Sequence, residues 1–395
     1  MPDQPLRICH LITRMIVGGA QENTLLSARG QAADGHAVTL ATGPSPGPEG
    51  RLLDRMAAPG VTVAEIPHLI REVRPWQDAL ACRRLVRFFR DQRFDVVHTH
   101  SSKAGILGRL AARRAGVPLV VHTVHGQAFH ANERWWRNRL FILAERRAAH
   151  ASDRIFAVCQ AMVDQCVAAG IAPAAKYQVV YSGMELEPYL TGRRDPELRR
   201  QLGIPEHAPV VGKIARLFEL KGHDCLLAAA AQVIREVPET RFLLVGDGLL
   251  RPALETAAAR LGIRDRVVFA GLVSPAEVPR YVAQMDILAH LSLREGLPRA
   301  VVQAFAAGLP AVGYPLDGTP EVIRDGQTGR LCPVGDAAAV AAALLELLRS
   351  PQAARAMGAA GRALAVERFD WRHMVTDLET AYRAGLSCKL LGTPF

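Results

Sequence analysis

The segment from Ser292 to Asp336 carries the clearest chemistry in this chain. Glu295 lies in a Gly-Pro turn, and apolar residues then follow at helical spacing, which predicts a helix that begins near Pro298. The first amides of a helix and the positive end of its dipole attract a phosphate, while a carboxylate accepts hydrogen bonds from sugar hydroxyls. The segment therefore predicts a clamp for a ligand that contains both groups. Position 303, eight residues after Glu295, is expected to face the same site.

Two further segments carry cations where an anion could bind. Arg216 and Lys221 stand five residues apart around a turn after a predicted strand, and two cations at this spacing match a pyrophosphate. Ser102 and Lys103 precede a helix that opens with small residues, which is typical of an anion site. A solvated side chain is the alternative interpretation of Lys103, because a single lysine in a loop is common.

A glycine pair follows the first predicted strand. Gly18 and Gly19 permit a close approach of backbone to a ligand just before a helix. The surrounding sequence is not the GxGxxG fingerprint of dinucleotide binding, and a plain turn is the alternative interpretation.

Elements that could position these residues alternate regularly along the chain. Short apolar runs, from RICHLI to KYQVVYSG, alternate with Ala-, Leu- and Arg-rich stretches at helical spacing, and the pattern begins again after Gly183. This is the α/β pattern of doubly wound parallel sheets, whose ligands bind at the carboxyl ends of the strands. A polar, proline-bearing stretch near 182–195 predicts the linker between two such domains.

Composition narrows the classes of protein and partner. A chain of 395 residues with 49% hydrophobic residues can bury two cores. The formal net charge of +10 favours an acidic partner, for which a diphosphate, an anionic membrane and nucleic acid all qualify. We do not expect nucleic acid to be a partner, because aromatic residues are only 6% of the chain and no zinc-finger or basic-helix motif occurs.

The seven cysteines and the N-terminus predict a compartment. The cysteines form no CxxC pair and suggest neither a disulfide framework nor a zinc site. The N-terminus lacks signal-peptide architecture, and no apolar run reaches the roughly 18 residues that cross a bilayer. We therefore expect a cytoplasmic protein.

One predicted helix suggests a peripheral position on the inner face of the plasma membrane. The segment NERWWRNRLFILAERRAAH places two tryptophans and several aliphatic side chains on a helix with five arginines. A basic amphipathic helix can lie on an anionic membrane. Packing of its apolar face inside the N-terminal domain is the alternative.

In order and spacing these motifs resemble glycosyltransferase family 4, from about residue 6 to about 382. The resemblance implies the GT-B fold, with two doubly wound Rossmann-like domains that face a cleft. It implies an acceptor-side domain at 1–185, a nucleotide-sugar domain at 186–370, and a C-terminal helix within 371–395 that packs back on the first domain. The family's acid-x7-acid signature begins here at Glu295, but Gln303 stands where the family has its second acid.

The resemblance also assigns roles to residues. It makes His125 and Glu295 the catalytic candidates, with His125 against the donor sugar. Gln303 would still accept a hydrogen bond from the nucleotide ribose through its carbonyl oxygen. We also expect Ser102 and Lys103 to bind the acceptor, because a lipid-diphosphate acceptor brings an anion that needs a cation. The resemblance assigns donor binding to Gly18, Gly19, Arg216, Lys221, Gly246, Gly271, Val273, Glu295, Gly296, Leu297, Pro298 and Gln303.

The reaction implied is retaining transfer of a sugar from a nucleotide diphosphate, expected to be a uridine one, to a lipid-linked saccharide or other cell-envelope acceptor. The chain contains no DxD string, so we expect no metal and no other cofactor. A non-hydrolysing sugar-nucleotide epimerase, a glycogen-type synthase and a degenerate sugar-nucleotide binder are the alternatives.

Overall fold

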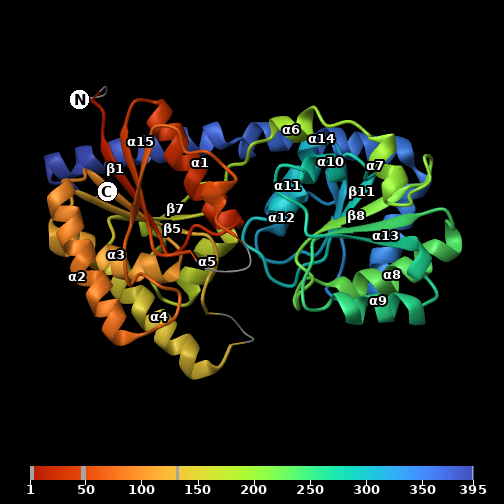
Figure 1. Cartoon of the computed structure of the whole chain (residues 1–395), viewed down its shortest axis with the longest axis horizontal. Coiled ribbons are helices and arrows are strands. Elements are labelled where there is room, and N and C mark those ends of the chain that lie inside the picture. Colours follow the sequence, from red (N-terminus) through yellow and green to blue (C-terminus); the bar gives the residue numbers. More distant parts are fainter. Residues whose placement is uncertain (1–3, 46–49, 130–132, 394) are drawn as a thin grey trace. The chain divides into compact units, whose positions relative to one another are not determined.

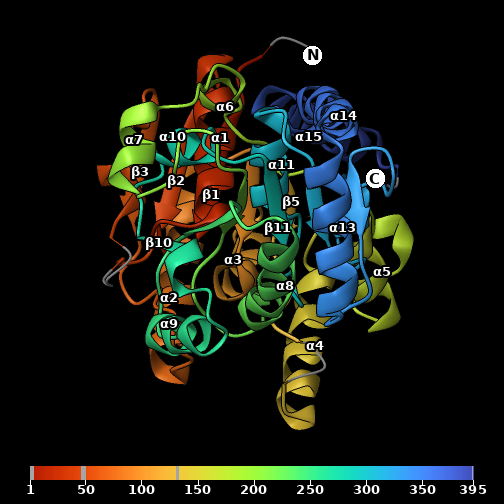
Figure 2. The same ribbon diagram turned by 90° about the vertical axis from the view of Figure 1, so that its right-hand side faces the viewer.

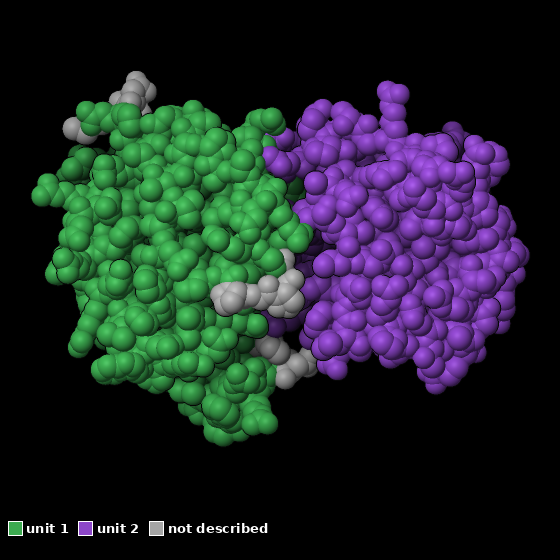
Figure 3. Space-filling model, in the orientation of Figure 1, with its two compact units in different colours: residues 1–184, 371–395 green, residues 185–370 purple. Residues whose placement is uncertain are grey.

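The computed structural model describes residues 4–45, 50–129, 133–393 and 395. Its contacts divide the chain into two compact units, which Figure 3 colours separately. Unit 1 comprises Met1–Met184 together with Trp371–Phe395, and unit 2 comprises Glu185–Asp370. Each unit is a parallel sheet with helices on both faces (Figure 1).

The sheet of unit 1 has the order β3-β2-β1-β4-β5-β6-β7 in the described part of the chain, and all its pairs are parallel. Its strands are β1 (Arg7–Ile12), β2 (Ala37–Thr42), β3 (Val61–Glu65), β4 (Val96–His100), β5 (Leu119–Val124), β6 (Arg154–Ala157) and β7 (Tyr177–Val179). Its helices are α1 (Gly19–Ala33), α2 (Pro75–Gln92), α3 (Ser102–Ala115), α4 (Trp135–His150), α5 (Gln160–Ala168) and α15 (Trp371–Leu391).

Alternate residues of these strands face two separate cores. On one face, Ile8, Val96 and Phe156 are packed in one cluster with side chains of α1 and α15. On the other face, Cys9 and Val97 join a cluster with α2 and α3. Both faces of the sheet are therefore apolar, which explains why its central strands read as continuous apolar runs. Full burial of one such large side chain stabilises the fold by roughly 1.5–3 kcal/mol.

The last helix, α15, is part of the core of unit 1. A Cβ added at Gly30 of α1 would lie 2.5 Å from a methyl group of Val375, and one added at Gly183 would lie 2.4 Å from the Cα of Trp371. Glycine at both positions thus lets α15 lie directly on unit 1, although its sequence is separated from the rest of the unit by all of unit 2.

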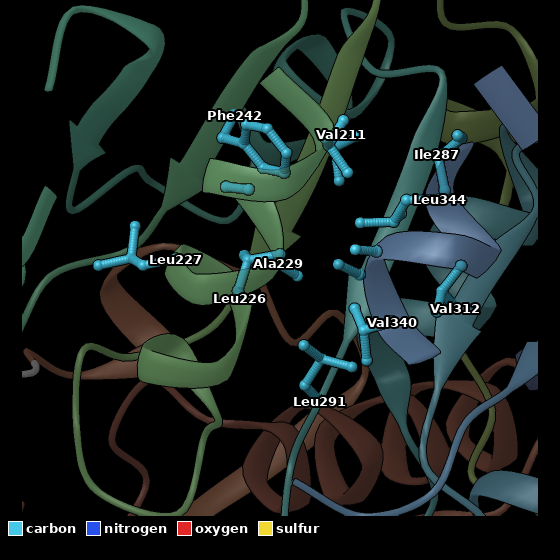
Figure 4. Packing of buried hydrophobic residues seen from close by; sticks show 14 of the residues in the cluster. Val211, Leu226, Leu227, Ala229, Phe242, Ile287, Leu291, Val312, Val340 and Leu344 are labelled. Atoms are coloured by element: carbon cyan, nitrogen blue, oxygen red, sulfur yellow. The ribbon is translucent and has the colours of Figure 1, made fainter. Parts of the chain in front are cut away.

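The sheet of unit 2 has the order β10-β9-β8-β11-β12-β13 in the described residues and is also parallel. Its strands are β8 (Val210–Ile214), β9 (Arg241–Val245), β10 (Val267–Gly271), β11 (Ile287–His290), β12 (Ala311–Gly313) and β13 (Gly329–Leu331). Its helices are α6 (Glu187–Leu190), α7 (Pro196–Gln201), α8 (His223–Glu236), α9 (Arg251–Arg260), α10 (Val278–Val282), α11 (Arg299–Ala306), α12 (Thr319–Val322), α13 (Ala337–Arg349) and α14 (Pro351–Phe369). Figure 4 shows its core, where Val211 and Phe242 of the sheet share a cluster with Leu226 of α8 and Leu344 of α13.

The α/β fold with two doubly wound parallel sheets, predicted from the sequence, is confirmed. Every apolar run that predicts a strand contains one: RICHLI coincides with β1, whereas KYQVVYSG is paired only over β7. β3 was not predicted. In the described residues, no helix is both long and apolar enough to cross a membrane.

Candidate active site

The centre of the candidate site in unit 2 is an ion pair between Lys221 and Glu295. Lys221 follows β8 and Glu295 follows β11, the neighbouring strand, so both lie at the carboxyl ends of paired strands. The Lys221 Nζ donates a hydrogen bond of 2.9 Å to Glu295 Oε1. Each side chain keeps more than a fifth of its surface exposed. An ammonium has three donors, so Lys221 retains capacity for a second anion.

The charge state of Glu295 is set by its neighbours. Burial alone would raise the pKa of Glu295, but His290 and Lys221 outweigh it and hold that pKa below its usual value. Burial lowers the pKa of His290 to about 4, and its Nε2 lies 3.6 Å from Glu295 Oε1. At neutral pH, Glu295 is therefore a carboxylate beside a neutral imidazole, with Lys221 as its counter-ion.

Strained backbone holds the two loops of this pair. Leu220 and Asp317 have φ values of 64° and 49°, in the left-handed region that side chains other than glycine rarely adopt. The carboxylate of Asp317 accepts a 2.8 Å hydrogen bond from the backbone N–H of Glu295, and the carbonyl of Leu220 accepts one from Leu293. Both strained residues thus fix the loop that presents the carboxylate.

Arg216 lies at the end of β8 and is exposed. Its guanidinium lies 5.0 Å from the ring centroid of Phe218. The Nε2–H of His223, the first residue of α8, donates to the carbonyl of Arg216 at 3.0 Å and fixes the backbone of this loop. Arg216 therefore presents a positively charged side chain from an anchored backbone.

Gly246 and Gly271 lie side by side at the ends of β9 and β10. The N–H of Gly246 donates to the carbonyl of Gly271 at 2.9 Å. Their φ values of 133° and 77° favour glycine, and a Cβ at Gly246 would meet the carbonyl oxygen of Ala215 at 2.1 Å. Val273 lies half-buried in the loop that leads from β10 to α10. Glycine at these two positions therefore lets the backbone after β8, β9 and β10 pack closely together.

Helix α11 begins at Arg299, as the spacing of its apolar residues predicts. Gly296 and Leu297 precede it, Leu297 is buried, and Pro298 is the residue before its first turn. Gln303 lies on α11 and is half-buried, and its backbone carbonyl accepts from Ala307. The described residues thus place Glu295 and Gln303 on one connected loop and helix.

In unit 1, the glycine loop and the β4–α3 junction follow neighbouring strands, β1 and β4. Gly18 precedes α1 with φ 174°, an extended conformation that any residue adopts, so its backbone angles do not require glycine. Gly19 is the first residue of α1, and Glu22 lies in its first turn. Ser102 begins α3 and is half-buried.

Lys103 is not a solvated lysine. Its Nζ lies 2.5 Å from a carboxylate oxygen of Asp78 on α2, it also donates to the carbonyl of Glu72, and only 13% of its side chain is exposed. An acceptor phosphate would therefore have to share or replace the Asp78 carboxylate.

His125 follows β5 and lines a small cavity in unit 1, together with Ser102, Arg109 and Glu145. The cavity has a volume of about 30 Å³, enough for a few water molecules. Arg109 is fully buried in its wall and forms a 2.6 Å ion pair with Glu145. His122 packs beside the cavity and bonds Thr99 Oγ1 at 3.0 Å. His130, which shares their segment, lies outside the described residues.

Three site residues of unit 2 were missed from the sequence. Asp317 and His290 contact the loop of Glu295, and Lys213 is buried in β8. Lys213 had a readable signal, because a lysine inside an apolar run of a central strand must be buried. The roles of Asp317 and His290 depend on pairing between distant segments, which the sequence does not display.

Two family models match the chain, one for each unit. The model described as "Glycosyl transferase 4-like domain" matches residues 18–183, and the model described as "Glycosyl transferases group 1" matches residues 194–364. An Escherichia coli protein named UDP-Gal:alpha-D-GlcNAc-diphosphoundecaprenol alpha-1,3-galactosyltransferase is 30% identical over 275 residues, which is 69% of this chain and 70% of that protein. A Streptomyces scabiei D-inositol 3-phosphate glycosyltransferase is 32% identical over 307 residues, covering 74% of this chain and 68% of its own.

Solved structures share the fold. The crystal structure of Anabaena Alr3699/HepE in complex with UDP has a TM-score of 0.81 and 23% identity, and the match covers 96% of this chain and 100% of that one. WaaG, a glycosyltransferase involved in lipopolysaccharide biosynthesis, gives a TM-score of 0.72 at 18% identity, with 95% and 99% covered. The family models, the relatives and the fold agree, and the chain belongs to glycosyltransferase family 4, as a hexosyltransferase-type enzyme with the GT-B fold.

Proposed function

We propose that this glycosyltransferase moves a sugar from a UDP-sugar to a lipid-linked saccharide, with retention of configuration and without a metal. The observation that carries the proposal is the Lys221–Glu295 pair at the carboxyl ends of β8 and β11, with the exposed Arg216 on the same loop as Lys221. Arg216 and Lys221 supply two cations for a diphosphate, and Glu295 supplies a carboxylate for sugar hydroxyls. The E. coli relative is named for a UDP-galactose donor and a diphosphoundecaprenol acceptor, which supports both substrate classes.

The proposed roles follow from this geometry. Arg216 and Lys221 neutralise the diphosphate as its bond to the sugar breaks, and Glu295 accepts hydrogen bonds from the sugar hydroxyls. Backbone groups near Gly246, Gly271 and Val273 bind the base.

Bond exchange needs no protein nucleophile in this proposal. The bond between the anomeric carbon and the diphosphate oxygen breaks, and a bond to the acceptor oxygen forms on the same face of the sugar. The acceptor proton passes to the leaving phosphate oxygen. His125 binds the donor sugar, and Gln303 accepts from the ribose.

Ligand stabilisation tests donor binding. A UDP-sugar at a hundred times its dissociation constant is expected to add roughly 2.7 kcal/mol to the free energy of unfolding. Differential scanning calorimetry of the whole chain with UDP-, GDP- and ADP-sugars measures this. Because all four tryptophans (Trp76, Trp135, Trp136 and Trp371) belong to unit 1, tryptophan fluorescence would not report directly on unit 2. Stabilisation by none of the nucleotide sugars would count against donor binding.

Lys103 is proposed to bind an anion of the acceptor, in exchange for Asp78. The Lys103→Ala substitution is expected to raise the acceptor's Michaelis constant and to leave donor affinity nearly intact. Asp78→Asn is the matched variant, and it should lower the Michaelis constant because it frees the ammonium. Steady-state kinetics with varied acceptor measure both. Loss of donor affinity in Lys103→Ala would instead place this lysine in the donor site.

Helix α4 is proposed to bind an anionic membrane surface. Trp135, Trp136, Leu140 and Leu143 are between 45% and 71% exposed, so these side chains are not packed inside unit 1 as the alternative required. In Figures 1 and 2 the N-terminal half of α4 projects from the body of unit 1. Arg137 and Arg139 are exposed on the same helix, and Arg134 is exposed directly before it.

Flotation with anionic vesicles tests this surface. The wild-type protein should float at low salt and sediment at high salt, since the attraction is partly electrostatic. The double variant Trp135→Ala with Arg139→Glu should lose binding. The control, Trp76→Ala with Arg83→Glu, makes the same changes on exposed residues of α2 and should still float. Equal flotation of both double variants would contradict the proposal.

A further inference from the structure

A chain of buried hydrogen bonds leads from α1 to His125. The Oε1 of Gln31 lies 2.7 Å from the Nε2 of His10, and the Nδ1 of His10 lies 2.9 Å from the Nε2 of His100. The Nδ1 of His100 in turn lies 3.0 Å from the Nε2 of His125. Gln31, His10 and His100 are all fully buried. These residues, with His125 at the end, form what we call the histidine chain.

The sheet of unit 1 explains why these side chains meet. β4 lies between β1 and β5, and His10 and His100 point to the face that α1 and α15 cover. His100 is in register with Thr123, and His125 is two residues further on, so it continues the same face. The rings of His10 and His100 are inclined by 23° with centroids 5.2 Å apart, and those of His100 and His125 by 29° with centroids 5.3 Å apart, as for rings that are hydrogen-bonded edge to edge.

The position of Gln31 at the end of the histidine chain fixes the direction of its hydrogen bonds. An amide oxygen only accepts hydrogen bonds, so the Nε2 of His10 must carry the proton. The Nδ1 of a neutral His10 is then an acceptor, and the Nε2 of His100 must donate to it. By the same step, the Nδ1 of His100 accepts from the Nε2–H of His125. The lone pair of a neutral His125 is therefore on its Nδ1.

We propose that Gln31, His10 and His100 are positioning residues that hold His125 in its Nε2–H tautomer, with Nδ1 as the nitrogen that accepts from a substrate hydroxyl. The second half of this inference rests on the proposed function, because it needs His125 to meet a sugar. The first half concerns the folded protein alone.

Neutral imidazoles are required for this direction, and their surroundings keep them neutral. Burial lowers the pKa of His10 to about 4. Burial, followed by the neighbouring histidines, lowers the pKa of His100 well below its usual value. A charged His10 or His100 would donate from both nitrogens and would reverse the hydrogen bonds that follow it.

The same cluster could be interpreted as a metal site. The nitrogens of His10, His98 and His100 lie within 4.8 Å of one another. However, both nitrogens of His98 are bonded, to the hydroxyls of Tyr382 at 2.5 Å and Thr123 at 2.6 Å. Both nitrogens of His10 are also bonded. A metal would have to break these bonds, so the hydrogen-bonded chain accounts for the cluster better.

The tautomer of His125 can be measured directly. In long-range ¹H–¹⁵N spectra of the full chain labelled at its histidines, the two ring nitrogens of each tautomer differ in chemical shift. The His125→Gln substitution assigns the signals. We expect a protonated Nε2 and an unprotonated Nδ1 near neutral pH. A protonated Nδ1 with an unprotonated Nε2 would overturn the proposal, because the hydrogen bonds of the histidine chain would then have the opposite direction. Loss of the ring-nitrogen signals of the histidine chain on adding Zn²⁺ would also overturn the proposal, in favour of a metal site.

Two variants test what sets the direction. Gln31→Leu removes the acceptor, and a buried N–H of His10 without a partner is unfavourable. The tautomer of His125 should therefore shift toward Nδ1–H. Thr123→Val removes only a partner of His98 and should leave His125 unchanged, which controls for general loosening of the sheet. An unchanged tautomer in a folded Gln31→Leu protein would contradict the role of Gln31.

A measurement of sugar transfer distinguishes failure of this inference from failure of the proposed function. If Nδ1 of His125 accepts from substrate, kcat of Gln31→Leu falls by at least about twofold, in proportion to the lost tautomer. A wild-type protein with the Nε2–H tautomer but no sugar transfer would refute the proposed function and leave the tautomer assignment intact. Sugar transfer with the Nδ1–H tautomer would refute the histidine chain alone.

Discussion

Replacing Arg216 by alanine is expected to weaken binding of the nucleotide diphosphate by roughly ten- to a hundredfold. The reason is that a hydrogen bond to a charged group contributes about 1.5–3 kcal/mol, and Arg216 is an exposed cation on the loop that also carries Lys221. The fold should tolerate the change, because Arg216 is exposed and its loop is held through its backbone carbonyl by His223.

Titration calorimetry with UDP measures this effect, and two further variants serve as a control and a comparison. Arg260→Ala removes the same charge from an exposed position at the end of α9 and should bind UDP like the wild type. Lys221→Ala should lose at least as much affinity as Arg216→Ala, and it also leaves Glu295 without its counter-ion. Equal UDP affinity of the Arg216→Ala and Arg260→Ala proteins would show that Arg216 has no part in donor binding.

Replacing Lys213 by methionine is expected to stabilise unit 2 most strongly at low pH. Lys213 is 2% exposed, and burial, together with the charge of Lys221, lowers its pKa from 10.5 to about 7. The unfolded chain therefore holds a proton between about pH 7 and 10.5 that the folded chain releases, so stability from this group rises with pH across that window. Below pH 7 its full cost is present, on the order of 5 kcal/mol for a shift from 10.5 to about 7 at 1.36 kcal/mol per pKa unit.

Methionine has a similar length and no charge, so the variant should lose this pH dependence. We expect its advantage over the wild type to be largest near pH 6 and to shrink toward pH 10. Calorimetry at several pH values measures this for unit 2, which contains no tryptophan. A variant less stable than the wild type at pH 6 would show that the folded protein stabilises the charged lysine, for instance through Glu295.

The strands of both sheets could be predicted because burial on both faces makes them apolar throughout. β3 escaped prediction for the opposite reason. It lies at the edge of its sheet, and none of its five residues is buried, so VTVAE shows no apolar run. The end of β7 was placed too late, because the buried Val180 extends the apolar run beyond the strand.

The candidate site was predictable where one segment carries its own signal, as at Glu295 or the Arg216–Lys221 pair. The histidine chain joins β1, β4 and β5 with α1, so sequence spacing could not reveal it. One signal was available, because His98 and His100 alternate on a strand and must share a face. The partner of Lys103 was also hidden, since Asp78 lies on a different helix.

The most direct test of the proposed function is a transfer assay with a UDP-sugar and a saccharide linked to a lipid diphosphate, in excess EDTA. Mass spectrometry and NMR of the product report whether a sugar was added and whether its anomeric configuration was retained. We predict acceptor-dependent release of UDP and an α-linked product from an α-linked donor, with unchanged rate in EDTA. Conversion of the donor to its epimer without acceptor, inversion at the anomeric carbon, or activity that EDTA abolishes and magnesium restores would contradict it.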